Sequence, residues 1–210
     1  MKKAMTPKLQ STIALTSEKG GVGKSTLAVN LAGALSLNAT TVLVDEDPIQ
    51  SCAKWAAHAG KLPFRVMSPK SIDQNAIASA RYLLIDTEGR PKFHEIVELV
   101  ASSTLVLLPC STSRIEIDAT LELVNRLSET KVDFNKLKVV ITRAPPVGTV
   151  GQQARDALKQ AGVPVAQTVI RAYIAHQTAC EVGVLVRDAP DPRASQAWSD
   201  VLELALEVAR

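Results

Sequence analysis

A glycine-rich segment near the amino end, residues 18–26 with the sequence EKGGVGKST, has the residue types of an anion-binding loop. Glycine lacks a Cβ atom, so the backbone N–H groups of such a loop can crowd around an anion. An apolar run precedes the segment and a helical pattern follows it, which directs the free N–H groups of the helix start at the same anion. In this context Lys24 can reach the β- and γ-phosphates of a nucleotide, and the hydroxyl of Ser25 can contact Mg²⁺.

Two positions set this loop apart from the strict pattern G-x-x-x-x-G-K-[ST]. Glu18 stands where the pattern requires its first glycine, and a second lysine, Lys19, comes directly before the glycine pair. A glycine-rich turn without a ligand is the alternative interpretation. The order of strand, glycines, Lys-Ser pair and helix favours a phosphate-binding loop over such a turn.

Carboxylates follow two apolar runs farther along the chain. The run 41–44 ends in Asp45, Glu46 and Asp47, and the run 82–85 ends in Asp86. Because ligands of open α/β sheets bind at the carboxyl ends of parallel strands, we expect these acids beside the glycine-rich loop. Their mutual repulsion favours a cation nearby, and Asp86 is predicted to bind Mg²⁺ through water and to hold Ser25. The alternative is polar strand ends that cap the next helix or turn.

Short β-branched runs alternate with helical patterns over the whole chain. We expect strands at 12–16, 41–44, 64–66, 82–85, 105–108, 139–141 and 165–169, and helices at 24–35, 51–59, 92–100, 117–128, 150–160 and 193–209. In the helix 24–35, the side chains of Leu27, Leu31, Ala34 and Leu35 are predicted to share one face. The alternation predicts an α/β fold, with a single doubly wound, mostly parallel sheet of about seven or eight strands flanked by helices.

The composition is that of an ordinary globular chain: 210 residues, of which 46% are hydrophobic, 21% charged and only 3% aromatic, with a net charge of +3. These values exclude disordered and low-complexity classes and favour one domain over 1–210, with 1–10 as a flexible amino end. No apolar run has the roughly 20 residues of a membrane span, and Lys2, Lys3 and Lys8 precede no secretory core. The cysteines form no metal or disulfide pattern, so the expected location is the cytoplasm.

The motif K-G-G-x-G-K-[ST] at 19–25 resembles the deviant Walker A motif of the ParA/MinD superfamily, which consists of P-loop NTPases of the SIMIBI type. Segments 41–48 and 82–89 are similar to the family's D-x-D-P and Walker B stretches, and 107–109 and 139–143 to two of its strand ends. The resemblance implies a slow, partner-stimulated ATPase that binds ATP and Mg²⁺. The implied nucleotide site consists of Lys19, Gly20, Gly21, Val22, Gly23, Lys24, Ser25, Thr26 and Arg143.

The resemblance also assigns roles to single residues. Lys19 is implied to cross a nucleotide-sandwich homodimer and to contact the phosphates of the partner subunit. Lys24 is implied to hold the phosphates, and Asp47 to orient the hydrolytic water. Arg143 is implied to end the strand that flanks the adenine.

Two departures from the family pattern concern the loops after the acidic strands. The glutamine that usually follows D-P directly is replaced by Ile49, with Gln50 one position later, so no role is assigned to Gln50. The usual D-T-P-P reads D-T-E-G here. A glycine after Asp-Thr, Gly89 in this chain, resembles a sub-branch that includes the accessory ATPases of T-DNA transfer.

As a small ParA-like protein, the chain is expected to dimerise with ATP and to bind DNA without sequence preference, and so to associate with the nucleoid when ATP is bound. A ParB-like or centromere-binding adaptor is expected to stimulate hydrolysis and thereby to segregate plasmid DNA. An accessory ATPase of conjugation or T-DNA transfer, or a positioner of other cargo, would share this nucleotide chemistry. A metabolic ligase or kinase of the dethiobiotin-synthetase kind would need a second small-molecule pocket, for which the sequence has no motif.

Other residues carry weaker signals. The candidates for a DNA-facing surface are Arg155, Lys159, Arg171, Arg187 and Arg193, with ordinary solvated helix faces as an equal alternative. The final helix is poor in basic residues and is expected to pack on the sheet rather than to bind a membrane. Cys110 is expected to be a buried structural thiol, and Trp55 and Trp198 to pack between helices and sheet. The histidines, His58, His94 and His176, have no metal-ligand spacing.

Overall fold

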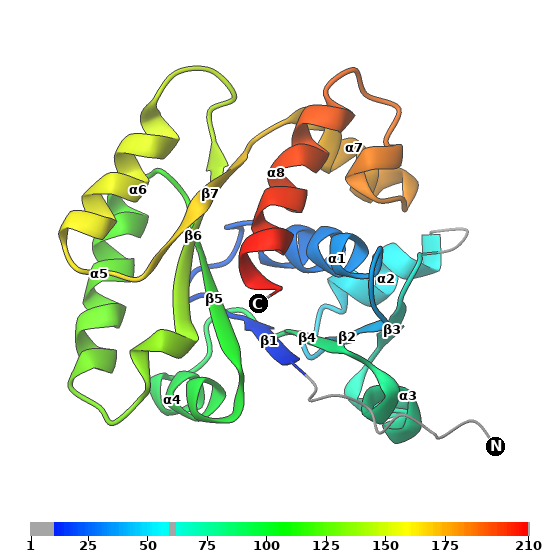
Figure 1. Cartoon of the computed structure of the whole chain (residues 1–210), viewed down its shortest axis with the longest axis horizontal. Helices are drawn as coiled ribbons and strands as arrows, with labels where there is room; N and C mark the ends of the chain where they lie inside the picture. Colours follow the sequence, from blue (N-terminus) through cyan, green and yellow to red (C-terminus); the bar gives the residue numbers. More distant parts are fainter. Residues whose placement is uncertain (1–10, 59–61, 210) are drawn as a thin grey trace.

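The computed structural model describes residues 11–58 and 62–209, which form one seven-stranded sheet with helices on both faces (Figure 1). The strand order is β3-β2-β4-β1-β5-β6-β7, and each neighbouring pair runs parallel. The strands are β1 (Ser11–Leu15), β2 (Thr41–Asp45), β3 (Arg65–Met67), β4 (Tyr82–Asp86), β5 (Leu105–Cys110), β6 (Leu137–Ala144) and β7 (Val165–Arg171). The α-helices are α1 (Lys24–Leu35), α2 (Ser51–His58), α3 (Gln74–Ser79), α4 (Phe93–Ser102), α5 (Arg114–Ser128), α6 (Val150–Gln160), α7 (Ile174–Val182) and α8 (Ala194–Val208). This arrangement confirms the predicted doubly wound α/β fold.

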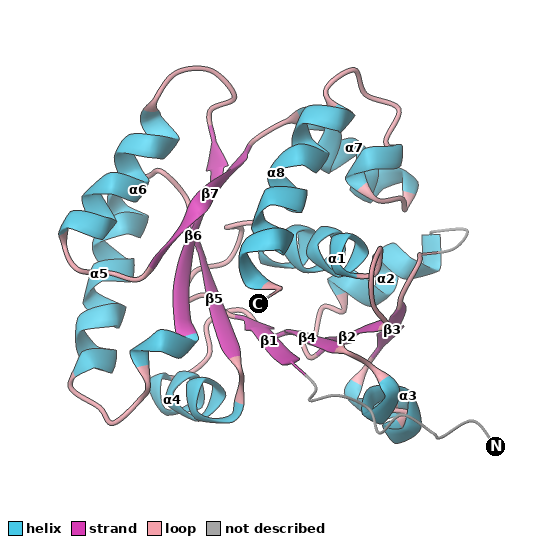
Figure 2. Ribbon diagram, in the orientation of Figure 1, coloured by secondary structure: helices cyan, strands magenta, loops and turns pink. Residues whose placement is uncertain are grey.

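Two helical layers enclose the sheet. Helices α1, α2, α7 and α8 lie on one side, and α4, α5 and α6 lie on the other (Figure 2). Along β1, Ile13 and Leu15 point into the first layer and Ala14 into the second, and all three side chains are fully buried. A central strand that is covered on both faces is apolar throughout, and this pattern made the strands predictable.

Helix α1 occupies the middle of the first layer and is buried along its length from Leu27 to Leu35. The four residues predicted to share one face are buried, and burial extends around the helix because α8 covers a side of α1 that the sheet does not cover. Close packing here depends on a glycine. A Cβ atom at Gly33 would lie 2.6 Å from Leu185 Cδ1.

Two helices were not expected from the sequence, α3 and α7. Both are short, and neither has a strong apolar stripe. The side chain of Asp73 caps α3 by accepting from two backbone N–H groups, and α7 ends at Gly183, which has the left-handed conformation with φ 72°. Helix α5 begins at Arg114, earlier than the predicted 117, and other boundaries differ by a residue or two, as helix ends commonly do.

The final helix, α8, packs on β7 and α1, which confirms the predicted packing on the sheet. The burial of Cys110 and of Trp55 also agrees with the predictions. Within residues 11–58 and 62–209, no helix combines the length and apolar character needed to cross a bilayer. The predicted flexible segment 1–10 lies outside the described residues, and the single domain over 1–210 stays a prediction.

Candidate functional site

The loop between β1 and α1 has a backbone conformation that depends on its glycines. Gly21 and Gly23 have φ angles of 81° and 87°, which glycine adopts without a steric penalty. Gly23 is also the N-cap of α1, so the free N–H groups of the first helical turn face the loop. Around Gly20, no atom lies within 4 Å of the position of a Cβ. The loop is therefore an open cradle at a helix start.

Strand β6 holds this cradle from one side. The hydroxyl of Thr142 donates to the carbonyl oxygen of Val22 at 2.8 Å, and the Arg143 guanidinium donates to the carbonyl oxygen of Gly21. Arg143 also lines a cavity of about 490 Å³ beside the loop, which we call the side cavity. Arg143, predicted to end the strand that flanks the adenine, thus contacts the glycine-rich loop and lines the cavity next to it.

Lys24 brings together the ends of two strands. The side chain is only 7% exposed, and Nζ donates to Asp86 Oδ1 at 2.7 Å and to the carbonyl oxygen of Thr87. Asp47 Oδ2 lies 3.8 Å from the same Nζ. The ammonium group is therefore held at the floor of the loop by carboxylates, where the phosphates of a bound nucleotide would compete for it.

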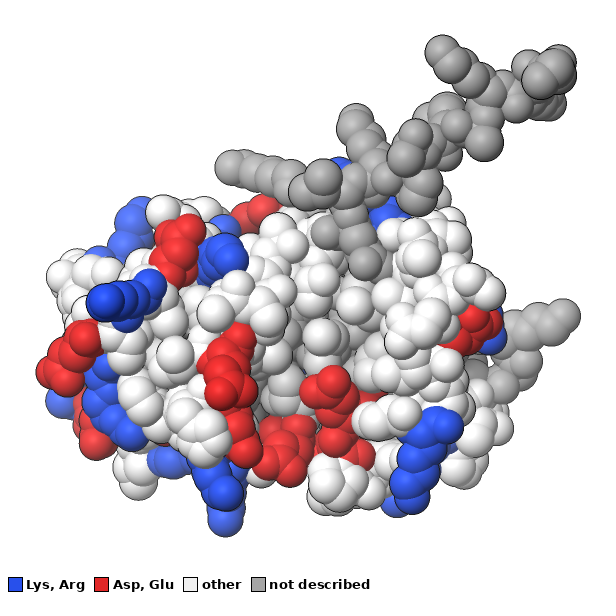
Figure 3. All heavy atoms as spheres, turned by 90° about the horizontal axis from the view of Figure 1, so that it is seen from below, with Lys and Arg blue, Asp and Glu red and all other residues white. Residues whose placement is uncertain are grey.

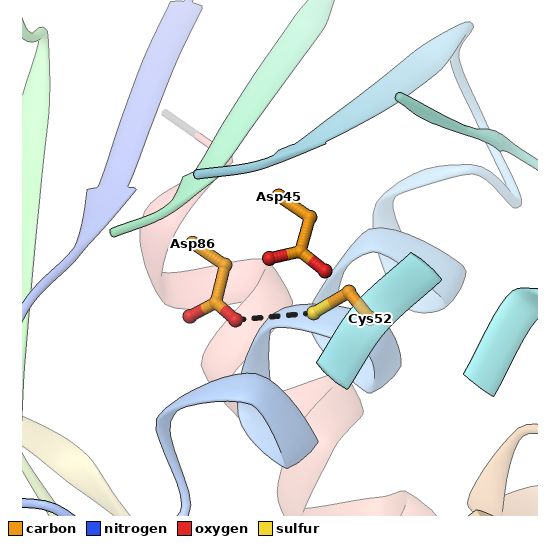
Figure 4. Close-up of side chains that lie close together, drawn as sticks. All are labelled: Asp45, Cys52 and Asp86. Atoms are coloured by element: carbon orange, nitrogen blue, oxygen red, sulfur yellow. Dashed lines mark hydrogen bonds between the residues drawn. The ribbon is translucent and has the colours of Figure 1, made fainter. Parts of the chain in front are cut away.

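The register of the sheet places Asp45 and Asp86 side by side at the ends of β2 and β4. Both are fully buried, and Cys52 from the first turn of α2 points toward them (Figure 4). The thiol of Cys52 donates to Asp86 Oδ2 at 3.1 Å. One ligand atom from each of the three residues lies within 4.8 Å of the others.

Burial sets the protonation of this cluster. Burial raises the pKa of the Asp45 carboxyl above its ordinary value, and the neighbouring Asp86 charge raises it further, against hydrogen bonds from the backbone of Ala53 and Asp47. Burial also raises the pKa of the Cys52 thiol well above its ordinary value, with both aspartates adding to the effect. The sulfur therefore keeps its proton and serves as a hydrogen-bond donor.

A cavity of about 540 Å³, which we call the loop cavity, opens over the glycine cradle. Four side chains that the sequence analysis singled out for chemistry share it, because their strands end at the same edge of the sheet. The lining residues are Ser17, Lys19, Gly20, Gly21, Val22, Gly23, Lys24, Ser25, Thr26, Asp47, Pro48, Ile49, Ser51, Glu88 and Gly89. Asp86 joins this set through its ion pair with Lys24.

Lys19 lies on its own subunit in this structure. Its Nζ is 3.3 Å from the carbonyl oxygen of Ile115, in the first turn of α5, and the side chain is half-buried. The lysine lines the loop cavity, and its ammonium group makes a long hydrogen bond to the backbone of the described part of the chain. Its predicted reach across a dimer stays a prediction.

The donor set fits Mg²⁺. Ser25 offers a hydroxyl oxygen from the start of α1, and Asp86 offers carboxylate oxygens from the end of β4. Mg²⁺ prefers hard oxygen ligands and keeps several waters, which agrees with one hydroxyl and one carboxylate beside an open cavity. The protonated thiol of Cys52 is not a ligand that Mg²⁺ prefers.

Strained backbone gathers at the same edge of the sheet. Within the described residues, the non-glycine residues with positive φ are Gln50 (56°), Arg90 (64°) and Arg143 (53°). Gln50 lies in the segment after β2, Arg90 lies in the segment after β4, and Arg143 is the next-to-last residue of β6. Each left-handed residue costs about 1 kcal/mol or more, and such strain is typically kept at functional sites.

Comparison with known proteins agrees with this geometry. The model of the CobQ/CobB/MinD/ParA nucleotide-binding domain matches residues 13–183. The chain belongs to this family. The ParA and MinD proteins of the family are ATPases, so the resemblance of the loop to a deviant Walker A motif is confirmed at the level of the family.

Individual relatives cover nearly the whole chain. Maintenance of carboxysome distribution protein A of Gloeobacter kilaueensis is 28% identical over 206 residues, which are 94% of this chain and 94% of the relative. The ATP complex of a McdA variant from Cyanothece has a TM-score of 0.71 at 16% identity, covering 96% of this chain and 98% of that one. The MinD of Pyrococcus horikoshii with Mg-ADP has a TM-score of 0.70 at 16% identity, covering 96% and 97%. The structural likenesses support the family fold.

Some residues of the site were not foreseen. Cys52 had no sequence signal, because its partner Asp86 is 34 positions away. The sequence analysis grouped Asp45 with other acids but gave it no contact of its own. The wall of the side cavity formed by α7 was missed with the helix itself, although Gly183 directly after the helix is a usable helix-end signal.

Proposed function

We propose that the protein is a ParA/MinD-type ATPase that dimerises with ATP and uses hydrolysis to position a cargo. The observation that carries this proposal is the place of Lys24. Its buried ammonium group lies inside a glycine cradle and contacts Asp86, with Asp47 3.8 Å away. A lysine bound only to carboxylates and a carbonyl oxygen is ready to bind phosphate when a nucleotide enters the loop cavity.

The residues around the loop cavity divide the work of hydrolysis. Lys24 and the backbone N–H groups of the loop bind the phosphates and stabilise the charge that develops on them. Ser25 and Asp86 would hold Mg²⁺, which would neutralise phosphate charge. Asp47 would hold and orient the attacking water: the residue lines the loop cavity, and the backbone N–H of Ile49 donates to its Oδ1 at 2.8 Å and fixes the carboxylate there.

The dimer would add Lys19. Each Lys19 ammonium group is proposed to reach the phosphates in the partner subunit and to act as an arginine finger does, by stabilising transferred charge only in the closed dimer. The weak contact of Lys19 with the carbonyl oxygen of Ile115 supports this role, because little has to be broken to release the side chain. Slow hydrolysis by the monomer and faster hydrolysis in a partner-bound dimer would follow.

Cargo positioning is favoured over other uses of the same chemistry by a relative similar over nearly the whole chain, which is named for carboxysome distribution. Segregation of plasmid DNA, and an accessory role in conjugation or T-DNA transfer, differ from it in the partner rather than in the nucleotide site. An adaptor protein on the cargo is proposed to stimulate hydrolysis in each case. A metabolic ligase or kinase would show steady turnover without DNA or a partner protein.

DNA binding without sequence preference is proposed for the ATP-bound dimer, which would associate with the nucleoid in the cytoplasm. The monomer carries no strong basic field on the face shown in Figure 3, where basic and acidic side chains are interspersed among the described residues. Arg155, Arg171 and Arg187 form ion pairs with neighbouring aspartates. Lys159 and Arg193 are exposed. In a dimer, the positive charges of two copies could face the same DNA and together contact more phosphates than one copy does.

Retention on DNA tests the proposal. The wild-type chain is incubated with ATP, ADP or no nucleotide, and its retention on non-specific DNA is measured across a salt series, with oligomeric state followed by light scattering. We expect a dimer and salt-sensitive retention with ATP only. The variant Lys24→Ala should show neither. A wild-type chain that binds no nucleotide, or that turns ATP over rapidly as a monomer without DNA, would contradict the proposal.

A further inference from the structure

Cys52 is a buried polar group that the proposed chemistry leaves unused. The residue is fully buried in the first turn of α2. Its Sγ lies 3.1 Å from Asp86 Oδ2 and 3.8 Å from the carbonyl oxygen of Ser25. One thiol therefore contacts both of the residues that are proposed to hold Mg²⁺.

The two carboxylate oxygens of Asp86 have different partners. Oδ1 accepts from Lys24 and Oδ2 accepts from Cys52. A phosphate that took over the Lys24 ammonium group would leave Oδ1 without its lysine partner. The hydrogen bond from Cys52 to Oδ2 would then remain. Among the described residues, no other side chain would be left to fix the plane of the Asp86 carboxylate.

The start of α2 is itself fixed to the neighbouring strand. Asp45 Oδ2 accepts the backbone N–H of Ala53 at 2.9 Å, and Asp45 Oδ1 accepts the backbone N–H of Asp47 at 3.2 Å. Asp45 therefore holds both the segment that carries Asp47 and the helical turn that carries Cys52. The position of the thiol relative to Asp86 is set by this buried network rather than by a free side chain.

We propose that Cys52 is a positioning residue of the magnesium site, which orients Asp86 through its thiol and connects it to the segment that carries Asp47. This inference rests on the nucleotide function proposed above. Partners that orient the ligands of a metal site are typically worth about 10–100-fold in metal affinity. The S–H group is a weak donor, but a carboxylate is a strong acceptor, and both side chains are fully buried.

The test measures metal binding apart from turnover. Mn²⁺ is used as the probe, and its affinity for the ADP-bound protein is measured by electron paramagnetic resonance for wild type, Cys52→Ala and Cys52→Ser. ADP affinity in EDTA is measured on the same samples. Cys110→Ala is the matched control, because Cys110 is also buried and its thiol donates to the carbonyl oxygen of Ser111 instead.

We expect Cys52→Ala to weaken Mn²⁺ binding about 10-fold or more while ADP affinity in EDTA stays unchanged. Cys52→Ser keeps a donor and should recover most of the loss, and Cys110→Ala should match wild type. If Cys52→Ala does not fold, Cys52→Val fills the space without a donor and replaces it. Wild-type Mn²⁺ affinity in the donor-free variant, or a loss in Cys52→Ser as large as in Cys52→Ala, overturns the inference. Failure of the wild-type chain to bind ADP would instead overturn the proposed function.

Discussion

Lys24 Nζ and Asp86 Oδ1 are 2.7 Å apart, and both side chains are buried, with 7% and 0% of their surface exposed. The lysine comes from the start of α1 and the aspartate from the end of β4, so the pair joins the glycine loop to the centre of the sheet. A buried charge that loses its partner is costly, so we expect this lysine to matter for stability as well as for the phosphate binding proposed above.

Replacing Lys24 by Ala is expected to lower the free energy of unfolding by about 3–5 kcal/mol, because Asp86 is left as an uncompensated buried charge beside Asp45. ATP binding should be lost as well. Urea denaturation without nucleotide measures the first effect and calorimetric titration with ATP the second. The exposed Lys54 on α2 provides the control, Lys54→Ala, which should change neither. A Lys24→Ala variant as stable as wild type would show that the ion pair contributes nothing to folding.

Asp47→Ala should separate binding from turnover. The carboxylate lines the loop cavity but stands 3.8 Å from the nearest atom of its ion-pair partner, Lys24, so its removal leaves the phosphate cradle intact. We expect ATP affinity close to that of wild type and a turnover rate lower by about 100-fold or more. Glu88→Ala, which removes an exposed acid from the same cavity, is the control. Loss of ATP binding in Asp47→Ala would contradict the assignment of Asp47 to the water.

Lys19→Ala is expected to leave nucleotide binding by the monomer unchanged. ATP-dependent dimerisation should be lost, and partner-stimulated hydrolysis should fall by about 10³-fold, the effect of removing a charge-stabilising finger. Light scattering with ATP and a turnover assay with saturating DNA and adaptor provide the two measurements. The exposed Lys131, in the turn that follows α5, gives the control variant Lys131→Ala. Unchanged dimerisation and stimulation in Lys19→Ala would refute the contact across the dimer.

Gly151→Ala should destabilise the fold without touching the loop cavity. A Cβ atom at this position would lie 2.7 Å from Val169 Cγ1 and 2.8 Å from Ala144 Cβ, so α6 would be forced away from β6 and β7. Overpacking of this kind costs about 1–3 kcal/mol, which outweighs the gain in helix propensity of about 1 kcal/mol. The melting temperature of Gly151→Ala, measured by thermal unfolding, checks this expected loss of stability. Gly89→Ala, where nothing lies within 4 Å of the new Cβ, should melt close to wild type.

His176 should make stability depend on pH. Burial lowers the pKa of His176 below its ordinary value of 6.5, and the Asp200 charge opposes this shift. Both ring nitrogens are buried, and neither has a hydrogen-bond partner among the described residues. The unfolded chain therefore takes up the proton first, and the free energy of unfolding should fall as the pH is lowered from about 6.5 toward the folded-state pKa. Denaturation at a series of pH values should show a weaker fall for His176→Gln than for the exposed control His94→Gln. Equal slopes would argue against a buried neutral histidine.

Much of the fold could be predicted from local order in the chain. The strands that carry Asp45 and Asp86 are apolar throughout because helices cover both of their faces, and that pattern is readable without a structure. Helix α7 was not readable in this way, since its small and polar residues give a weak periodic signal and its burial depends on contacts with the short 3-10 turn Val186–Asp188 and with α8. The same omission hid Tyr173 and His176 as walls of the side cavity.

The sequence by itself determined the glycine-rich loop that we propose binds phosphate, because three glycines, Lys24 and Ser25 act through a backbone conformation that a few adjacent residues dictate. The strand-end acids followed in the same way, since carboxyl ends of parallel strands share an edge. Only the tertiary structure decided which of these groups touch. The strand order β2-β4-β1 places Asp45 against Asp86 and turns Cys52 toward both, and contacts between such distant positions depend on how strands pair rather than on their order along the chain.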